Sequence, residues 1–474
     1  MAKKERTEQT VTIDAIGFEG ISIARDDMGV IFVKGGVPGD TLFVEVTHKR
    51  KKHREATIKK IIEPSPHRIE PRCSHFGLCG GCSWQQLEYS EQLRWKAQHV
   101  KDSFERLHKV SVARYDAPIG SEKQYEYRNK MEFSFGSSRW LSEEEISSEG
   151  EIKQKNYALG LHIPGRFDKV LPIDKCYLQI DIGNHVLTAI DTKCKELALT
   201  ARNSRLGEGF LRNLVIRKSQ TTEDFLIIVL TSAVKTDNEK LFVEWLFAEF
   251  SHKFLNEHTT IAHAINDTKS GVAIGEIVRQ VGSGSLKEMM SGFTYEISPF
   301  SFFQNNPKQF EKLLDVVYSY ANFNSDDIVW DLYCGTGLIT LPIAKSVTNV
   351  VGIELSQESI EKAIVNAKNH SIENTNFFAM NLHSKEALAL LENQQKPNVV
   401  VIDPPRAGSH PDLIEYLNNS GIEKIVYVSC NPTTQARDCA MLDQYQVEAV
   451  TAVDLFPQTY HIESVALLTK GNNG

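Results

Sequence analysis

Seven apolar, strand-like runs alternate with helical stretches over residues 291–474, and this alternation constrains the fold more than any other feature of the chain. The runs are Ile328–Tyr333, Asn349–Leu355, Asn376–Asn381, Asn398–Asp403, Lys424–Cys430, Val447–Val453 and Glu463–Lys470. Strands that alternate with helices form right-handed βαβ units around a mostly parallel sheet. The pattern therefore predicts a doubly wound, Rossmann-like α/β domain in the C-terminal part of the chain.

Polar residues stand at or near the ends of five of these runs. In open α/β sheets a ligand binds outside the carboxyl ends of the strands. Because these ends meet at one edge of a parallel sheet, we expect the polar side chains to surround one binding site. They are Asp331, Tyr333, Glu354, Asn381, Asp403 and Cys430.

The loop Asp331–Gly337, with the sequence DLYCGTG, indicates which ligand this site takes. Its glycines let the backbone approach a ligand closely, and Glu354 follows about twenty residues later, where an acid reaches ribose hydroxyls in nucleotide-binding folds. A nicotinamide enzyme would show GxGxxG, and the third glycine is missing here. A lone GTG turn can be a plain tight loop. Together with Glu354 and Asp403, it favours S-adenosylmethionine (AdoMet).

Cys430 ends an apolar run and begins a polar turn, in the segment VYVSCNPTTQARD. A thiol at the mouth of a buried strand can act as a nucleophile, but a single cysteine is more often a core residue. The polar residues at the other strand ends favour the nucleophile. Asp403 opens the motif DPPRAG, which is similar to the DPP[YF] motif of amino-group methyltransferases. Arg406 replaces the aromatic residue, and this replacement favours a carbon target over an exocyclic amine.

Residues 1–72 are expected to form a small β-barrel of the OB type, because five short β-type runs are separated by glycine turns. A loop with five Lys and Arg residues, His48–Arg54, lies between two of these runs. Such a loop can be merely solvated. On an OB-like barrel we expect it to contact the phosphates of a nucleic acid.

Three cysteines within ten residues, Cys73, Cys79 and Cys82, suggest a metal site, and Cys176 is the expected fourth ligand. Four thiolates bind either zinc or an iron–sulfur cluster. Zinc sites favour two CxxC-like pairs, so the three-plus-one spacing favours a [4Fe–4S] cluster that joins two segments. An AdoMet-radical enzyme is an alternative that also uses a cluster, but its CxxxCxxC spacing is absent here.

Residues 73–290 predict a central α+β domain. Leu87–His108 has the spacing of a helix, and Leu211–Arg217 pairs with Phe225–Leu230 as strands. Tyr127–Phe133 predicts a strand that mixes aromatic and cationic residues, which suits either RNA contact or a half-exposed position. Ser137–Lys155 is polar and acidic and predicts an exposed loop.

The net charge, the apolar runs and the number of cysteines restrict the class of protein. A net charge of −8 over 474 residues argues against bulk nucleic-acid binding, so such binding would use local patches. No signal peptide and no membrane-length apolar run are apparent. Eight cysteines in a chain of this length do not form a disulfide framework. We therefore expect a cytoplasmic protein without membrane contact, and a monomer.

The motifs DLYCGTG, DPPRAG, SCNPTT and DLFPQTYHIES, together with Gln304, resemble the RNA uracil-C5 methyltransferase family. The barrel resembles a TRAM domain, and the cysteines resemble the cluster ligands of the 23S rRNA 5-methyluridine enzymes. This resemblance implies that Cys430 is the nucleophile and Glu463 the base. It implies AdoMet contacts for Gln304, Tyr333, Glu354, Asn381 and Asp403. Leu338 is left out, because some relatives carry a polar residue there.

The same resemblance implies a methyl transfer to uridine C5 in 23S rRNA. The second hypothesis is the same chemistry on the T-loop of tRNA. A catalytically silent RNA-binding assembly factor is the third, and the presence of both Cys430 and Glu463 argues against it. Phe302 is a candidate to stack on an RNA base, with a core position as the alternative.

Overall fold

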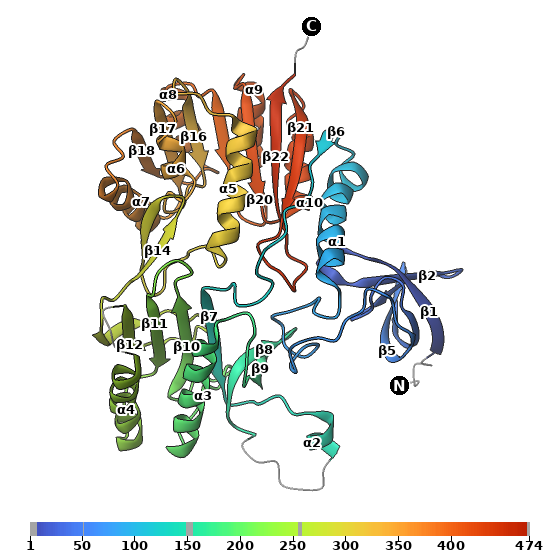
Figure 1. Cartoon of the computed structure of the whole chain (residues 1–474), viewed down its shortest axis with the longest axis vertical. Helices are drawn as coiled ribbons and strands as arrows, with labels where there is room; N and C mark the ends of the chain where they lie inside the picture. The colour runs from blue at the N-terminus through green and yellow to red at the C-terminus, as the bar shows by residue number, and fades with distance from the viewer. Residues whose placement is uncertain (1–6, 51, 148–154, 255–257, 472–474) are drawn as a thin grey trace.

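The computed structural model describes residues 7–50, 52–147, 155–254 and 258–471. The chain forms three bodies (Figure 1). A small barrel lies at one side near the N-terminus, a sheet covered by helices lies at the bottom of the view, and a larger sheet lies at the top. Among the described residues, none of the helices combines the length and the apolar character that crossing a bilayer requires.

The N-terminal body is a closed five-stranded barrel, as predicted, in the order β1-β2-β3-β5-β4. Its strands are β1 (Thr7–Ile16), β2 (Ser22–Asp26), β3 (Gly29–Val33), β4 (Thr41–Lys49) and β5 (His53–Glu63). Alternate apolar residues such as Val11 and Ile13 point inward and form a core of their own. The basic loop lies at the turn from β4 to β5, and its member Lys51 lies outside the described residues.

The central body is a seven-stranded sheet in the order β13-β12-β11-β10-β7-β8-β9. The strands are β7 (Lys130–Gly136), β8 (Ala158–Ile163), β9 (Arg166–Pro172), β10 (Leu211–Lys218), β11 (Phe225–Thr231), β12 (Thr259–Ile265) and β13 (Glu276–Val281). Helices α3 (Asp181–Glu196) and α4 (Asp237–Phe254) cover one face (Figure 1). The predicted strand pair is confirmed as β10 and β11, which run antiparallel.

Two central segments differ from the expectation. The strand predicted from Tyr127 begins only at Lys130. Tyr127 lies in the preceding loop, where its side chain is buried. The predicted exposed loop Ser137–Lys155 contains a short helix, α2 (Glu143–Ser147), and residues 148–154 lie outside the described residues.

The C-terminal body is an eight-stranded sheet in the order β18-β17-β16-β19-β20-β22-β21-β6, and it contains all seven predicted strands. They are β16 (Ile328–Leu332), β17 (Asn349–Glu354), β18 (Thr375–Ala379), β19 (Val399–Ile402), β20 (Lys424–Ser429), β21 (Tyr445–Val453) and β22 (Glu463–Lys470). The helices are α5 (Pro307–Ala321), α6 (Thr340–Ala344), α7 (Gln357–Asn369), α8 (Lys385–Asn393), α9 (Pro411–Asn419) and α10 (Pro432–Met441). The first five strands are parallel, and β22 is antiparallel between β20 and β21. A hairpin of β14 (Leu286–Met290) and β15 (Phe293–Ile297) precedes α5.

A segment from before the central sheet joins the C-terminal body. Strand β6 (Val112–Tyr115) pairs in parallel with β21. The predicted helix is confirmed as α1 (Tyr89–Asp102), which continues into a single π-helical turn and packs against β21 and α10. Residues that precede the central sheet thus complete the edge of the C-terminal sheet. The domain limits 1–72, 73–290 and 291–474 stay predictions.

Candidate active site

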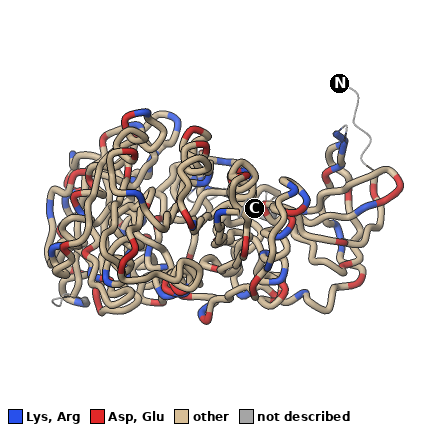
Figure 2. The backbone as a smooth tube through the Cα atoms, turned by 90° about the horizontal axis from the view of Figure 1, so that it is seen from above, with Lys and Arg blue, Asp and Glu red and all other residues tan. Residues whose placement is uncertain are grey.

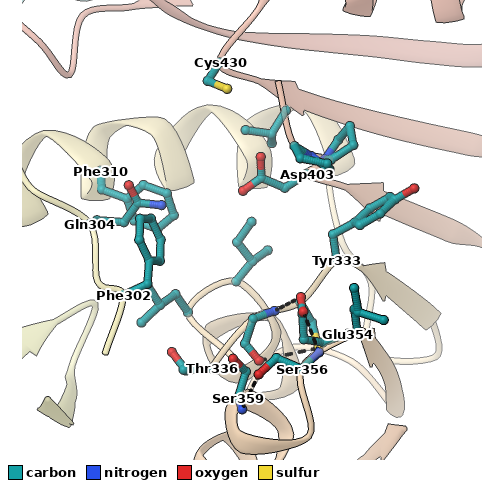
Figure 3. A pocket seen from close by; sticks show the side chains of 18 of the residues that line it. Phe302, Gln304, Phe310, Tyr333, Thr336, Glu354, Ser356, Ser359, Asp403 and Cys430 are labelled. Atoms are coloured by element: carbon teal, nitrogen blue, oxygen red, sulfur yellow. Dashed lines mark hydrogen bonds between the residues drawn. The ribbon is translucent and has the colours of Figure 1, made fainter. Parts of the chain in front are cut away.

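A cavity of about 1030 Å³ lies at the carboxyl ends of the C-terminal strands. The seven residues predicted for catalysis and AdoMet binding all line it: Gln304, Tyr333, Glu354, Asn381, Asp403, Cys430 and Glu463. In Figure 3 the Cys430 sulfur and the Asp403 carboxylate both point into the open space, and Gln304 and Phe302 enter from the opposite wall. The fold thus brings together side chains that are up to 159 positions apart.

The loop after β16 bends sharply around the cavity. Tyr333 has a φ of 68° and Gly335 a φ of 55°, and a Cβ at Gly335 would meet nothing within 4 Å. The Glu354 carboxylate accepts hydrogen bonds from the backbone N–H of Gly335, at 3.3 Å, and of Ser356, at 2.9 Å. The Tyr333 ring points away from the centre of the cavity (Figure 3). At this position the backbone and the Glu354 carboxylate therefore face the cavity.

Asp403 follows β19, where its backbone N–H donates to the carbonyl of Leu332. Burial raises the pKa of its carboxyl to about 7, and the neighbouring Asp331 adds to this effect. The turn behind it is clamped, because the Asn431 side chain donates to the carbonyl of Arg406 at 3.0 Å. Asn431 also accepts from the N–H of Thr433 and so caps α10. The SCNP and DPPR motifs therefore hold each other in place.

Cys430 and Glu463 come from neighbouring antiparallel strands. Strands β20 and β22 pair with Ser429 opposite Ser464, so Cys430 and Glu463 lie one position further along each strand, at the cavity. Burial and the adjacent acids Glu463 and Asp403 raise the pKa of the Cys430 thiol to about 12. Burial and Asp403 also hold the pKa of Glu463 well above its usual value. The Cys430 thiol is consequently protonated at neutral pH in the protein alone, and burial favours the neutral form of Glu463.

His461 and Arg406 also line the cavity, although the sequence did not single them out as site residues. The Arg406 guanidinium lies 3.2 Å from His461 Nδ1, so Nδ1 accepts this hydrogen bond. Burial lowers the pKa of His461 to about 4, and the charge of Arg406 adds to the shift. The imidazole is therefore neutral. The position of His461 two residues before Glu463 was the available sequence signal.

Three further residues of the cavity differ in how well the sequence anticipated them. Leu338, which was left out of the predicted site, lines the wall and is 8% exposed. Ser356 caps α7 directly after Glu354 and lies beside it (Figure 3). Phe302 is 76% exposed at the cavity, so it is not a core residue. Its stacking on a base stays a prediction.

Four cysteines line a second cavity of about 500 Å³: Cys73, Cys79, Cys82 and Cys176. All eight cysteines of the chain are free thiols. Burial, with a contribution from the other cysteines of the group, raises the pKa of Cys79 to about 11 and that of Cys82 to about 12. Four soft sulfur donors around one cavity are the chemistry that an iron–sulfur cluster requires.

The arrangement of these side chains does not by itself make a metal site. Within the described ranges, no group of three or more His, Cys, Asp or Glu side chains could hold a metal ion. The donor types therefore agree with the predicted cluster, while the positions of the side chains give it no support. The cluster is not established.

Comparisons with known proteins agree with this fold and site. A family model described as tRNA (uracil-5-)-methyltransferase matches residues 283–471, and a TRAM domain model matches residues 2–59. An uncharacterized RNA methyltransferase of Bacteroides thetaiotaomicron is 40% identical over 95% of this chain and 99% of its own length. One of Chlorobaculum tepidum is 35% identical over 98% of this chain and 96% of its own length.

A solved structure supports the same assignment. The tRNA (uracil-54, C5)-methyltransferase of Pyrococcus abyssi, in complex with S-adenosyl-L-homocysteine, matches 97% of this chain and 100% of its own with a TM-score of 0.74 and 26% identity. The fold and the cavity are those of an AdoMet-dependent methyltransferase that acts on RNA. The chain belongs to the RNA uracil-C5 methyltransferase family, and its N-terminal barrel is a TRAM domain.

Proposed function

We propose that this enzyme methylates C5 of a uridine in 23S rRNA through a transient bond between Cys430 Sγ and C6 of the uracil. The observation that carries the proposal is the pairing of β20 with β22, which delivers a thiol and a carboxyl to one cavity from adjacent strands. A nucleophile and a base on the same wall can act on neighbouring carbons of one ring.

The chemistry requires both groups, because uracil C5 is a weak nucleophile on its own. Addition of the Cys430 thiolate to C6 places negative charge on C5 and O4, and C5 then forms the new bond to carbon. AdoMet supplies the methyl group from its sulfonium centre. Glu463 removes the C5 proton, the electrons of that bond re-form the C5–C6 double bond, and the thiolate leaves C6. One difficult step is thereby divided into easier ones.

The positions of the polar groups support the predicted AdoMet contacts. Glu354 holds the Gly335 and Ser356 N–H groups and suits ribose hydroxyls. Asp403 points into the space between this loop and Cys430 (Figure 3). We assign the methionine end to Asp403 and Gln304. The Tyr333 backbone and Asn381 complete the predicted set, and both line the same cavity.

Ionisation of Cys430 is coupled to ligand binding in this proposal. With Glu463 and Asp403 close by, the thiol is held neutral in the protein alone. AdoMet brings a positively charged sulfonium and ammonium into the acidic cavity, and positive charge favours ionised acids and thiols. Binding of the cofactor therefore lowers the pKa values of these groups and prepares the nucleophile.

We keep the [4Fe–4S] cluster as part of the proposal. Cys73, Cys79, Cys82 and Cys176 would be its ligands, since all four line one cavity. The protein supplies sulfur donors from two segments about a hundred residues apart, so a bound cluster would hold these segments together.

The choice between rRNA and tRNA sets the decisive experiment. The family description and the Pyrococcus relative name tRNA, and this favours the T-loop uridine as the second candidate. Cys73, Cys79 and Cys82 resemble the cluster ligands of the 23S rRNA 5-methyluridine enzymes, and this resemblance favours 23S rRNA as the substrate. Purified enzyme is incubated with labelled AdoMet and transcripts of 23S rRNA or tRNA, and 5-methyluridine is mapped by mass spectrometry. Label in 23S rRNA alone supports the proposal, and label in tRNA alone replaces it with the second candidate.

A further inference from the structure

The loop between β21 and β22, residues 454–462, carries the proposed base into the cavity. Glu463 follows it directly, and three of its members, Leu455, Phe456 and His461, line the cavity themselves. A loop of this kind has few neighbours within its own sheet, so its position depends on the groups that hold its backbone.

Four successive carbonyls of this loop each accept a hydrogen bond from outside the sheet. The Asn306 side chain donates to Leu455, Lys96 Nζ to Phe456, the Tyr127 hydroxyl to Pro457, and the backbone N–H groups of Ser83 and Trp84 to Gln458. The donor-to-acceptor distances lie between 2.9 and 3.1 Å. All but Asn306 come from residues 83–127, which precede the central sheet.

An ion pair without solvent contact fixes the start of the loop. Lys96 Nζ lies 2.7 Å from Asp454 Oδ1, and both side chains are 0% exposed. The Tyr89 hydroxyl donates to the other oxygen of Asp454, and the N–H of Phe456 donates to Oδ1. A buried pair whose remaining lone pairs are satisfied in this way holds one geometry. Helix α1, which carries Lys96 and Tyr89, thereby sets where the loop begins.

The end of the loop is held by the residues that follow the cysteine group. Ser83, next to Cys82, accepts a hydrogen bond from the N–H of Tyr460 at 3.1 Å. Gln92 and Gln458 exchange two hydrogen bonds of 3.0 Å, and Gln458 has a φ of 68° that this exchange helps to hold. Only two residues, His461 and Ile462, separate Tyr460 from Glu463, so we expect a displacement at Ser83 to be passed on to the carboxyl.

We propose that Ser83, Lys96 and Tyr127 are positioning residues for Glu463, and that the segment after the cysteine group thereby sets the rate of proton removal from C5. The inference rests on the proposed function. It assigns a role to residues that do not line the catalytic cavity, and it connects the cysteine cavity to the catalytic cavity through Cys82, Ser83 and Tyr460.

The proposal identifies the step that a loosened loop slows. Cys430 directly follows β20 and lies outside this loop, so we expect addition to C6 and methyl transfer to proceed. Glu463 then takes the C5 proton less efficiently, and the bond from Cys430 Sγ to C6 persists for longer. A misplacement of about 1 Å costs on the order of a hundredfold in rate. The covalent enzyme–RNA adduct therefore accumulates during turnover.

Tyr127→Phe is the sharpest test, because it removes one hydroxyl from a buried ring. We expect a decrease in kcat on the order of tenfold and a larger fraction of enzyme in the covalent adduct at steady state. Tyr445→Phe is the matched control. The Tyr445 hydroxyl also donates to a backbone carbonyl, that of Ile422 at 2.8 Å, but far from the loop. This control should keep the wild-type kcat and adduct fraction.

Ser83→Ala and Ser83→Thr give an independent test on the other side of the loop. Alanine should raise the adduct fraction and lower kcat without changing the Kd for AdoMet, and threonine, which keeps the hydroxyl, should restore both. A fall in kcat with an unchanged adduct fraction in Ser83→Ala and Tyr127→Phe would overturn the inference. If Glu463→Gln itself yields no adduct, the proposed function fails instead, so the two failures are distinguishable.

Discussion

Glu463 lies beside Cys430 on the neighbouring antiparallel strand, and its carboxyl group opposes ionisation of the thiol. In the proposed function, a positively charged ligand in the cavity counteracts this opposition. The same acid that disfavours the thiolate in the protein alone would then serve as the base once the nucleophile has reacted. The proposal thus uses one pair of groups on adjoining strands for two successive steps.

Cys430→Ala should abolish methyl transfer to RNA, because no other thiol of the chain lines the catalytic cavity except Cys334, which is 5% exposed behind the loop. Binding of AdoMet should persist, since the residues assigned to it stay in place. Transfer of labelled methyl groups and isothermal titration with AdoMet measure the two properties. Unchanged turnover would refute the assignment of the nucleophile.

Glu463→Gln should trap the covalent adduct, because an amide does not take the C5 proton and the thiolate then leaves very slowly. The adduct appears as a band of reduced mobility on denaturing gels after incubation with RNA and AdoMet. Glu448→Gln is a suitable control, since Glu448 lies on the neighbouring strand β21, outside the cavity lining, and accepts a hydrogen bond from Thr469. Absence of the band from Glu463→Gln, with methylation lost, would contradict the role of the base.

Much of this arrangement follows from local sequence patterns. Alternating and continuous apolar runs predict the barrel and all seven C-terminal strands, since each element shows its own periodicity. The position of the site at one edge of the sheet is predicted as well, because parallel strands bring Asp403 and Cys430 to the same edge. Strand β22 runs antiparallel to β20, and this direction brings Glu463 to the same edge as Cys430.

Contacts between distant segments do not follow from such patterns. Nothing local indicates that Val112–Tyr115 pairs with β21, or that Lys96 forms an ion pair with Asp454, 358 positions away. A buried lysine on a helix has no sequence signature, because its partner is set by tertiary packing. Likewise, the hydrogen bond between Arg406 and His461 joins two turns that only the fold brings together.

The Cys430 thiol should react slowly with iodoacetamide in the absence of AdoMet, because its pKa of about 12 leaves little thiolate at neutral pH. The rate should keep rising with pH beyond about 10, where the reaction of an ordinary cysteine with a pKa of about 8.5 has levelled off. Saturating AdoMet should accelerate the reaction at fixed pH if it leaves the sulfur accessible.

Peptide mapping by mass spectrometry isolates Cys430 from the other seven cysteines. Glu463→Gln should accelerate the reaction at alkaline pH, because it removes the carboxylate that opposes the thiolate. A rate that reaches half of its maximum near pH 8.5 in the wild-type protein would contradict this account of the site.

Anaerobically purified protein should be brown, with iron and a broad absorption near about 400 nm, if the four cysteines hold a [4Fe–4S] cluster. Cys176→Ala should lose both the iron and the colour. Cys194→Ala should keep them, because Cys194 is buried in the core of the central body and does not line the cysteine cavity. A colourless wild-type preparation that contains zinc would overturn the cluster.

Asp331→Asn should stabilise the AdoMet-free protein at alkaline pH. Asp331 is 0% exposed, and burial raises its pKa from 3.8 to about 7, with a contribution from Glu354. Only one of its oxygens accepts a side-chain hydrogen bond, from Thr340 at 2.5 Å, and the other has no partner among the described residues. The folded protein therefore favours the neutral carboxyl, and an asparagine is neutral at every pH.

The sign of the pH dependence follows from the pKa of the Asp331 carboxyl in the unfolded chain, 3.8, and in the folded protein, about 7. Below about pH 4 the carboxyl is protonated in both the folded and the unfolded chain, so wild type and Asp331→Asn differ little. Between about pH 4 and pH 7 the unfolded chain ionises while the folded protein does not, and the wild type loses stability relative to the variant. Above pH 7 the difference should level off, on the order of 2–4 kcal/mol.

Urea unfolding at pH 5, 6, 7 and 8 measures this difference, with Asp326→Asn as the control. Asp326 is exposed and accepts one hydrogen bond from the neighbouring Ser325, so its replacement should leave stability unchanged at every pH. A gain for Asp331→Asn that is equal at pH 5 and pH 8 would mean that ionisation is not its cause. A loss that grows with pH would mean that the Asp331 carboxylate is stabilised in the fold, contrary to its burial.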